Sequence, residues 1–241
     1  RHAQNLIAVS ESVKTILANA FPTLRDKIVV IPNWLSSQAV LNLKTREEAR
    51  NHFKINRPFA LAVVGQITPL KGQHLVLEVV RRMVTQNCAA DLEVYIFGQS
   101  QPKDYAYEQE VRALAHKPEL KNHIHFLGAV PHLASYLSAF DIVVAPSINE
   151  GFSIAAIEAM NAGAVVIASN IGGLSEIIEH ERTGILFPVG EINALKDALL
   201  RVMNDESLRV SIASSAQLYA RTTSLYAGAG SRYCTDRNAG R

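Results

Sequence analysis

Short apolar runs alternate with longer amphipathic segments over most of the chain, and this alternation restricts the fold more than any other feature. The runs at 59–65 and 141–147 are rich in Val and Ala and have the length of buried strands. The segment 72–86, after the first of them, carries apolar residues at helical spacing. Strands that alternate with helices predict βαβ units and a parallel sheet covered on both faces.

The pattern predicts an α/β fold, a Rossmann-like doubly wound parallel sheet that begins near residue 59 and ends near residue 204. Its six strands are expected at 59–65, 92–98, 123–128, 141–147, 164–169 and 184–189. Helices are expected at 72–86, 104–117, 131–139, 153–163, 173–180 and 191–204. Before the sheet, the pattern predicts strands at 6–9 and 27–33 and helices at 10–21 and 46–53.

The two ends of the chain depart from this pattern. Apolar periodicity is lost at 219–241, where Gly, Ser, Thr and Arg are frequent, so we expect a poorly ordered or non-native tail. The chain starts with Arg1, and a strand follows within a few residues. That start suggests a fragment of a longer protein.

Composition argues against several functional classes. The net charge of +2 is too small to favour a nucleic-acid partner, and the longest apolar runs are strand-sized, so no transmembrane segment is expected. The two cysteines, Cys88 and Cys234, lie far apart and form no CxxC pattern. This usage indicates free thiols in a reducing compartment, and it favours a cytoplasmic protein.

Two glutamates stand out because ligands of a doubly wound sheet bind beyond the carboxyl ends of its strands. Glu150 precedes Gly151 at a strand end, where the helix 153–163 begins and its free amides and dipole attract anions. Glu158 lies in an apolar part of that helix, where a carboxylate needs a hydrogen-bond partner such as two ribose hydroxyls. Alternatively, Glu150 is an ordinary helix-start acid and Glu158 a solvated or salt-bridged residue. The spacing alone does not decide between these interpretations.

The loop from Gly65 to Gly72 follows the first strand of the sheet and carries Lys71 at the mouth of the next helix. An ammonium group there could hold a diphosphate, although a solvated lysine is the simpler interpretation. A cation is unfavourable at that end of a helix, which favours a functional role. No G-x-G-x-x-G follows a strand and no P-loop occurs, so a dinucleotide-dependent oxidoreductase is disfavoured.

His123 and His125 would face the same side of a strand and could in principle share a metal ion. No cysteine or carboxylate is close to them in the sequence, so we favour structural or surface histidines and expect no bound metal. His74, near Lys71, could reach a phosphate or could be an ordinary histidine of a helix surface.

Several motifs occur together in a fixed order: VVGQITPLKG, IFGQS, HFLGAV, APSINEGFSIAAIEAMNAGAVVIASNIGGLSEII and RTGILFPVG. They closely resemble the donor-binding domain of retaining GT-B glycosyltransferases of the group-one type (family four). The resemblance covers residues 1 to about 218 and is most specific over 140–190. NLIAVSESVKTIL and VIPNW resemble the junction between the two domains of such enzymes. The resemblance implies that 1–45 is a remnant of this junction and that 46–218 is the donor-binding domain, the C-terminal half of a GT-B fold.

The resemblance also implies a role for each matching residue. Glu150 would contact the donor sugar and support the reaction electrostatically, and Lys71 would grip the diphosphate. Glu158 would bind the ribose hydroxyls. Other predicted donor-binding residues are the backbone from Leu127 to Val130, which would frame the base, the amides of Gly151, Phe152 and Ser153, and the strand-end residues Gly65, Gln66 and Gly98.

Gln66 departs from the family pattern, which usually has an arginine at this position. That guanidinium would join Lys71 on the diphosphate, whereas a glutamine is neutral and offers one amide group. Loss of a charge-assisted contact of this kind costs about 1.5–3 kcal/mol. The donor site is therefore expected to be weakened, adapted to another donor or decayed.

The resemblance implies a glycosyltransferase that moves a sugar from a nucleoside-diphosphate sugar to a hydroxyl acceptor with retention, without a cofactor or metal, in polysaccharide biosynthesis. The acceptor, a saccharide or a lipid-linked glycan, would bind to the missing N-terminal domain, so this chain alone should transfer little or nothing. Two alternatives remain, a non-catalytic nucleotide-sugar-binding module and a GT-B sugar-nucleotide epimerase. The parent enzyme would be cytoplasmic, with peripheral attachment to the inner face of a membrane as an option.

Overall fold

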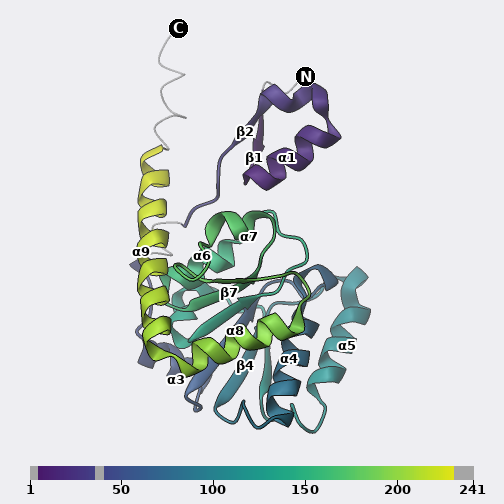
Figure 1. Ribbon diagram of the computed structural model, residues 1–241, viewed down its shortest axis with the longest axis vertical. Coiled ribbons are helices and arrows are strands. Elements are labelled where there is room, and N and C mark those ends of the chain that lie inside the picture. Colours follow the sequence, from purple (N-terminus) through teal and green to yellow (C-terminus); the bar gives the residue numbers. More distant parts are fainter. Residues whose placement is uncertain (1–4, 36–40, 231–241) are drawn as a thin grey trace.

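The computed structural model describes residues 5–35 and 41–230, with side chains up to residue 223. A parallel sheet forms its centre (Figure 1), with six strands in the order β5-β4-β3-β6-β7-β8. The strands are β3 (Phe59–Val64), β4 (Leu92–Phe97), β5 (Ile124–Gly128), β6 (Ile142–Ala145), β7 (Val165–Ser169) and β8 (Ile185–Phe187). Counted along the chain, this order is 3-2-1-4-5-6, which confirms the predicted Rossmann-like fold. From β3 the next two strands are added on one side of the sheet, and from β6 the remaining strands are added on the other. The topological switch point therefore lies between β3 and β6.

Helices cover both faces of the sheet because its strands are apolar on both sides. Alternate residues of β3, such as Leu61 and Ala62, enter two separate cores. The first core includes side chains from α4 (Gln73–Thr85), α5 (Tyr105–Ala115) and α8 (Ile192–Asn204). The second includes side chains from α3 (Arg46–Phe53), α6 (Ile154–Asn161) and α7 (Gly172–Ile177), with the 3-10 segment η4 (Leu133–Ala139).

Helix α9 (Glu206–Gly230) corrects the expectation of a poorly ordered tail from residue 219. It begins against the first core through Ile212 and reaches the second through Ala216 and Ala220, both fully buried. Two small residues four positions apart allow the helix to lie close to α6. The chain therefore stays helical to Gly230, and residues 231–241 lie outside the described part.

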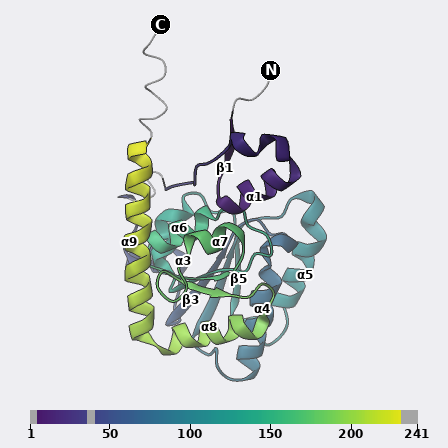
Figure 2. The same ribbon diagram turned by 45° about the horizontal axis from the view of Figure 1, so that its top comes forward.

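The N-terminal unit, residues 5–30, lies beside α7 at one end of the sheet (Figures 1 and 2). It consists of β1 (Leu6–Ala8), α1 (Glu11–Ala20), the 3-10 segment η1 (Pro22–Lys27) and β2 (Ile28–Val30), and the two strands pair in parallel. Its small core of Ala8, Ala18 and Ile28 is separate from both cores of the sheet. Ile7, Ile16 and Phe21 are more than half exposed. None of the helices in the described ranges is long and apolar enough to cross a lipid bilayer.

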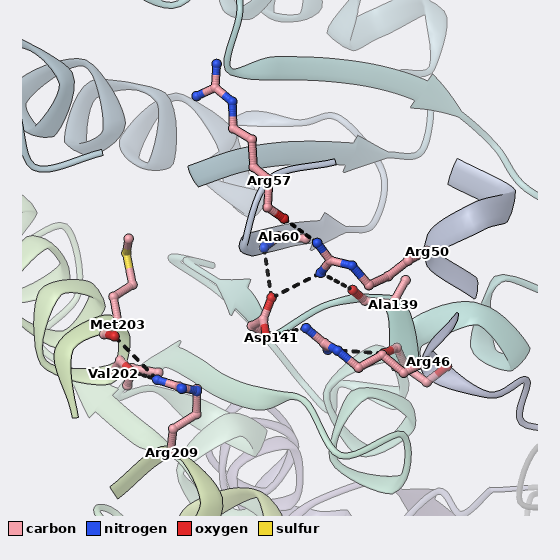
Figure 3. Close-up of polar contacts among 10 residues, drawn as sticks. Arg46, Arg50, Arg57, Ala60, Ala139, Asp141, Val202, Met203 and Arg209 are labelled. Carbon is pink, nitrogen blue, oxygen red and sulfur yellow. Dashed lines mark hydrogen bonds and ion pairs between the residues drawn. The ribbon is translucent and has the colours of Figure 1, made fainter. Parts of the chain in front are cut away.

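Asp141 fastens α3 to the amino end of the sheet (Figure 3), the end opposite the switch-point loops. Its carboxylate accepts a hydrogen bond from the Ala60 amide at 2.9 Å and forms ion pairs with Arg46 at 2.6 Å and Arg50 at 3.6 Å. Arg46 and Arg50 are one helical turn apart, so both guanidinium groups lie on the same face of α3. Asp141 thus joins the start of β6 to β3 and to the helix that covers them.

Replacement of Asp141 by asparagine should lower the free energy of unfolding by about 1–3 kcal/mol, because both ion pairs are lost while one oxygen stays for the Ala60 amide. Urea denaturation measures this loss. Asp91→Asn is the matched control, since Asp91 is exposed and such surface changes cost less than about 0.5 kcal/mol. Equal stability of the two variants would contradict the role of Asp141.

Candidate functional site

The predicted site residues Lys71 and Glu150 meet at the switch point of the sheet. Lys71 follows β3 and Glu150 follows β6, and the Lys71 Nζ lies 2.5 Å from Oε2 of Glu150. The Ser147 hydroxyl donates a longer hydrogen bond, 3.4 Å, to the same oxygen. The Glu150 side chain is only 9% exposed whereas that of Lys71 is 31% exposed. The carboxylate is therefore shielded, while the ammonium group remains accessible to a ligand.

The position of Lys71 follows from the packing of its own loop. Pro69 starts the 3-10 turn η2 (Pro69–Lys71), and Gly72 then adopts a left-handed conformation with φ +67°. A Cβ at Gly72 would lie 2.4 Å from the carbonyl oxygen of Pro146, so only glycine allows the loop to touch the end of β6. The aliphatic part of Lys71 passes over Gly65, where a Cβ would lie 3.7 Å from Cε.

The ends of β3, β4 and β5 are tied together through their main chains. Gly65 donates a hydrogen bond to Phe97, and Gly98 donates one to Gly128. A Cβ at Gly98 would lie 1.9 Å from the Gly65 oxygen, so this predicted donor-binding glycine shapes the loop through close main-chain packing. Leu127, which precedes Gly128 in β5, is exposed.

The 150–153 turn leads from β6 into α6. Ser153 caps that helix, because its hydroxyl accepts a hydrogen bond from the Ala156 amide at 3.3 Å. Phe152 packs into the second core, as does Val130 from the loop after β5. The predicted base-framing loop and the 150–153 turn thus share one apolar cluster.

Glu158, one turn into α6, is half-buried, and this burial raises the pKa of its carboxyl. Within residues 5–35 and 41–223, no side chain or amide forms a hydrogen bond or ion pair with the carboxylate. A half-buried carboxylate without a partner is costly to the free protein. Such a group is typical of a site that gains its partners from a ligand.

The first two residues of α7 support the 150–153 turn, a contact that the sequence analysis did not predict. Gly173 donates a hydrogen bond to the Glu150 carbonyl oxygen at 3.0 Å. A Cβ at Gly173 would lie 2.2 Å from the Gly151 oxygen, and one at Gly172 would lie 2.3 Å from the Glu150 oxygen. The two adjacent glycines after β7 indicate a close main-chain contact, but the sequence did not indicate which segment packs on them.

The first turn of α1 also approaches the 150–153 turn. A Cβ at Gly151 would lie 3.1 Å from a methyl group of Val13, and one at Gly172 would lie 3.6 Å from the Ser12 hydroxyl. The N-terminal unit therefore covers part of the turn that carries Glu150. The resemblance of these residues to a domain junction did not predict this contact.

Gln66 and the histidines considered in the sequence have other partners. Gln66 accepts a hydrogen bond from Gln73 through its main-chain oxygen, and His74 is paired with the Tyr107 hydroxyl at 2.8 Å. His123 contacts the Leu92 carbonyl oxygen. His125 stacks on Tyr95. In the described part of the chain, no group of three or more His, Cys, Asp or Glu could hold a metal ion.

Comparison with known proteins identifies the family. A family model described as "Glycosyl transferases group 1" matches residues 45–219. An uncharacterized glycosyltransferase of Methanocaldococcus jannaschii is 29% identical over 218 residues, which is 88% of this chain and 54% of that protein. The D-inositol 3-phosphate glycosyltransferase of Corynebacterium glutamicum is 32% identical over 166 residues, 68% of this chain and 40% of that protein. The chain thus spans about half the length of these relatives.

Solved structures share the fold. The Anabaena protein HepE in complex with UDP superposes with a TM-score of 0.86 at 23% identity, over 97% of this chain and 64% of HepE. The C-terminal domain of the group 1 glycosyltransferase LpcC from Francisella tularensis superposes with a TM-score of 0.70 at 26% identity, over 78% of this chain and 97% of that domain. The sheet with its covering helices has the fold of these structures, and the family model matches residues 45–219. The chain therefore belongs to the group 1 glycosyltransferases with a GT-B-type Rossmann-like domain.

Proposed function

We propose that this chain forms the donor-binding half of a retaining glycosyltransferase, which transfers a sugar from a nucleoside-diphosphate sugar to a hydroxyl group of an acceptor. The observation that carries the proposal is the contact between Lys71 and Glu150 at the switch point, where ligands of doubly wound sheets bind. The complexes of the similar HepE structure with UDP and with UDP-glucose add support.

The residues at this edge of the sheet suit the parts of such a donor. The ammonium group of Lys71 would neutralise the diphosphate as it leaves, and the free amides at the start of α6 would add a positive dipole. Glu150, held between Lys71 and Ser147, would accept hydrogen bonds from the sugar hydroxyls. Glu158 would accept two hydrogen bonds from the ribose, which would compensate for its burial. No step of this scheme requires a bound metal ion.

The acceptor, a saccharide or a lipid-linked glycan, would bind to a further N-terminal domain in the proposed full-length enzyme. Two features support this part of the proposal. The relatives are about twice as long as the matched region, and β1 and β2 expose Ile7 and Val29, which would pack in a larger sheet. Residues 5–30 would then belong to that domain, and the chain alone would bind the donor but transfer little sugar.

Gln66 favours a second candidate, a nucleotide-sugar-binding module without catalytic activity. Its side chain is neutral where the family usually has an arginine, so Lys71 would carry the charge of this loop alone. Assay of the chain joined to an acceptor-binding domain distinguishes the two functions, because only the enzyme consumes a nucleotide sugar in the presence of acceptor. Restored turnover in a Gln66→Arg variant would assign the inactivity to this position.

A Lys71→Ala variant tests the proposed diphosphate contact. Loss of the ammonium group also leaves Glu150 without its cation, so UDP should bind about tenfold more weakly or worse. Binding of uridine, which has no phosphate, should change little. Calorimetric titration of both ligands measures the difference, with Lys103→Ala as the control because Lys103 is exposed on another loop. Equal losses for UDP and uridine would show that Lys71 does not contact the diphosphate.

A further inference from the structure

Helix α1 contacts the sheet domain at α7 and covers part of the proposed donor site. The core of the N-terminal unit is separate from the two cores of the sheet, so no shared apolar layer holds the two together. Within residues 5–35 and 41–223, the polar contacts of α1 with the sheet domain come from one side chain, Glu176 of α7. This carboxylate is therefore the polar attachment of α1 to the described part of the sheet domain.

Glu176 caps the N-terminus of α1 from a distant part of the chain. Its Oε2 accepts a hydrogen bond from the Glu11 amide at 2.9 Å, and its Oε1 accepts one from the Ser12 amide at 2.8 Å. The Ser10 hydroxyl accepts a third from the Val13 amide at 3.1 Å. The first amides of a helix have no partner within the helix, and a carboxylate also complements its dipole. Both oxygens of Glu176 thus bind groups that need an acceptor.

The same helix that carries Glu176 also supports the 150–153 turn. Gly172 and Gly173, one turn before Glu176, lie directly on the Glu150–Gly151 main chain. The first turn of α1 lies on the other side of Gly151 through Val13. Helix α7 is thus the common support of α1 and of the turn that presents Glu150.

We propose that Glu176 is a positioning residue, whose contact with the Glu11 and Ser12 amides (the Glu176 clasp) seats α1 as a wall of the donor site. This inference rests on the proposed function. Glu176 is solvent-exposed, so the clasp can open without burying an unpaired charge. With the clasp closed, α1 lies over Gly151 and limits the space beside Glu150. With the clasp open, the N-terminal unit is free to move, and the donor site loses that wall.

Glu176→Gln tests the clasp, because glutamine keeps one acceptor oxygen but loses the charge and the second acceptor. Amide exchange by NMR should show the Glu11 and Ser12 amides exchanging about tenfold faster, whereas amides of β3 keep their rates. UDP should bind about three- to tenfold more weakly, since a smaller fraction of molecules has α1 in place. Glu179→Gln is the matched control, because Glu179 is exposed and its side chain pairs locally with Arg182.

Faster exchange at Glu11 and Ser12 together with weaker UDP binding, in Glu176→Gln but not in Glu179→Gln, would support the proposal. Unchanged exchange at these amides would show that no clasp forms. Faster exchange with unchanged UDP binding would restrict Glu176 to a structural contact and overturn its positioning role. If the unmodified chain bound no nucleotide, the proposed function and the positioning role would both fall, while the exchange rates would still decide whether the clasp exists.

Discussion

Glutamine at position 158 is expected to stabilise the free protein and, at the same time, to weaken UDP binding by about ten- to a hundredfold. The weaker binding follows from the loss of a charged acceptor for the ribose hydroxyls, since hydrogen bonds to charged groups contribute about 1.5–3 kcal/mol. The gain in stability follows from the half-buried position of Glu158, whose carboxylate has no hydrogen-bond partner in the described part of the chain.

The stability gain of Glu158→Gln should depend on pH in a defined direction. Burial raises the pKa of Glu158 above its usual value of 4.5, so the folded protein holds this proton more tightly than the unfolded chain. The free energy of unfolding therefore falls as the pH rises from 4.5 through the pKa of the folded state. The variant should match the wild type below this range and exceed it at neutral pH.

Urea denaturation at acidic and neutral pH measures the stability of Glu158→Gln, and calorimetric titration measures its binding. Comparison of UDP with 2′,3′-dideoxy-UDP isolates the ribose contact, because the wild type should prefer UDP and the variant should bind both alike. Glu110→Gln, an exposed change on α5, is the control. A variant that kept the preference for UDP would show that Glu158 does not bind the ribose.

Alanine at position 173 is expected to cost about 3 kcal/mol or more of folding stability, as severe overpacking does. The added methyl group would lie 2.2 Å from the Gly151 oxygen and 2.9 Å from the Phe152 Cα, both of them main-chain atoms. These atoms cannot turn aside as a side chain can, so the 150–153 turn or α7 must shift. If Gly173→Ala still folds, it should therefore bind UDP more weakly than the wild type.

Gly151→Ala is the matched control for Gly173→Ala, and urea denaturation compares their stabilities. A Cβ at Gly151 would meet a methyl group of Val13 at 3.1 Å, which a small side-chain movement relieves. Neither glycine has a positive φ, so both changes report on packing alone. If Gly173→Ala were as stable as Gly151→Ala, the close packing of α7 on the turn would be refuted.

The sheet could be predicted from the sequence because apolar residues recur at different spacings in its strands and in its helices. The runs around Leu61 and Val143 have apolar residues on both faces, and Gly65, Gly98 and Gly128 mark strand ends. Helix α9 was not predicted, since the last expected helix ended at residue 204 and the polar residues of α9 hide its apolar periodicity. Ala216 and Ala220 at helical spacing were the remaining indication.

The candidate site could be predicted in its residue types but only partly in its contacts. Lys71 and Glu150 were each selected because they follow a strand, whereas their 2.5 Å contact depends on β3 lying next to β6. Glu176 gave no sequence signal, since an exposed acid on a short helix is ordinary and its partner lies 165 residues away. Long-range contacts of this kind follow from packing, which local sequence patterns do not encode.

Calorimetric titration of the unmodified chain with UDP, GDP and ADP tests the central claim, a nucleotide-sugar site at the switch point, most directly. One of the three is expected to bind with a dissociation constant of about 1 mM or lower. That nucleotide would identify the base of the donor. If none of them bound at millimolar concentrations, the claim that Lys71, Glu150 and Glu158 form a donor site in this chain would be contradicted.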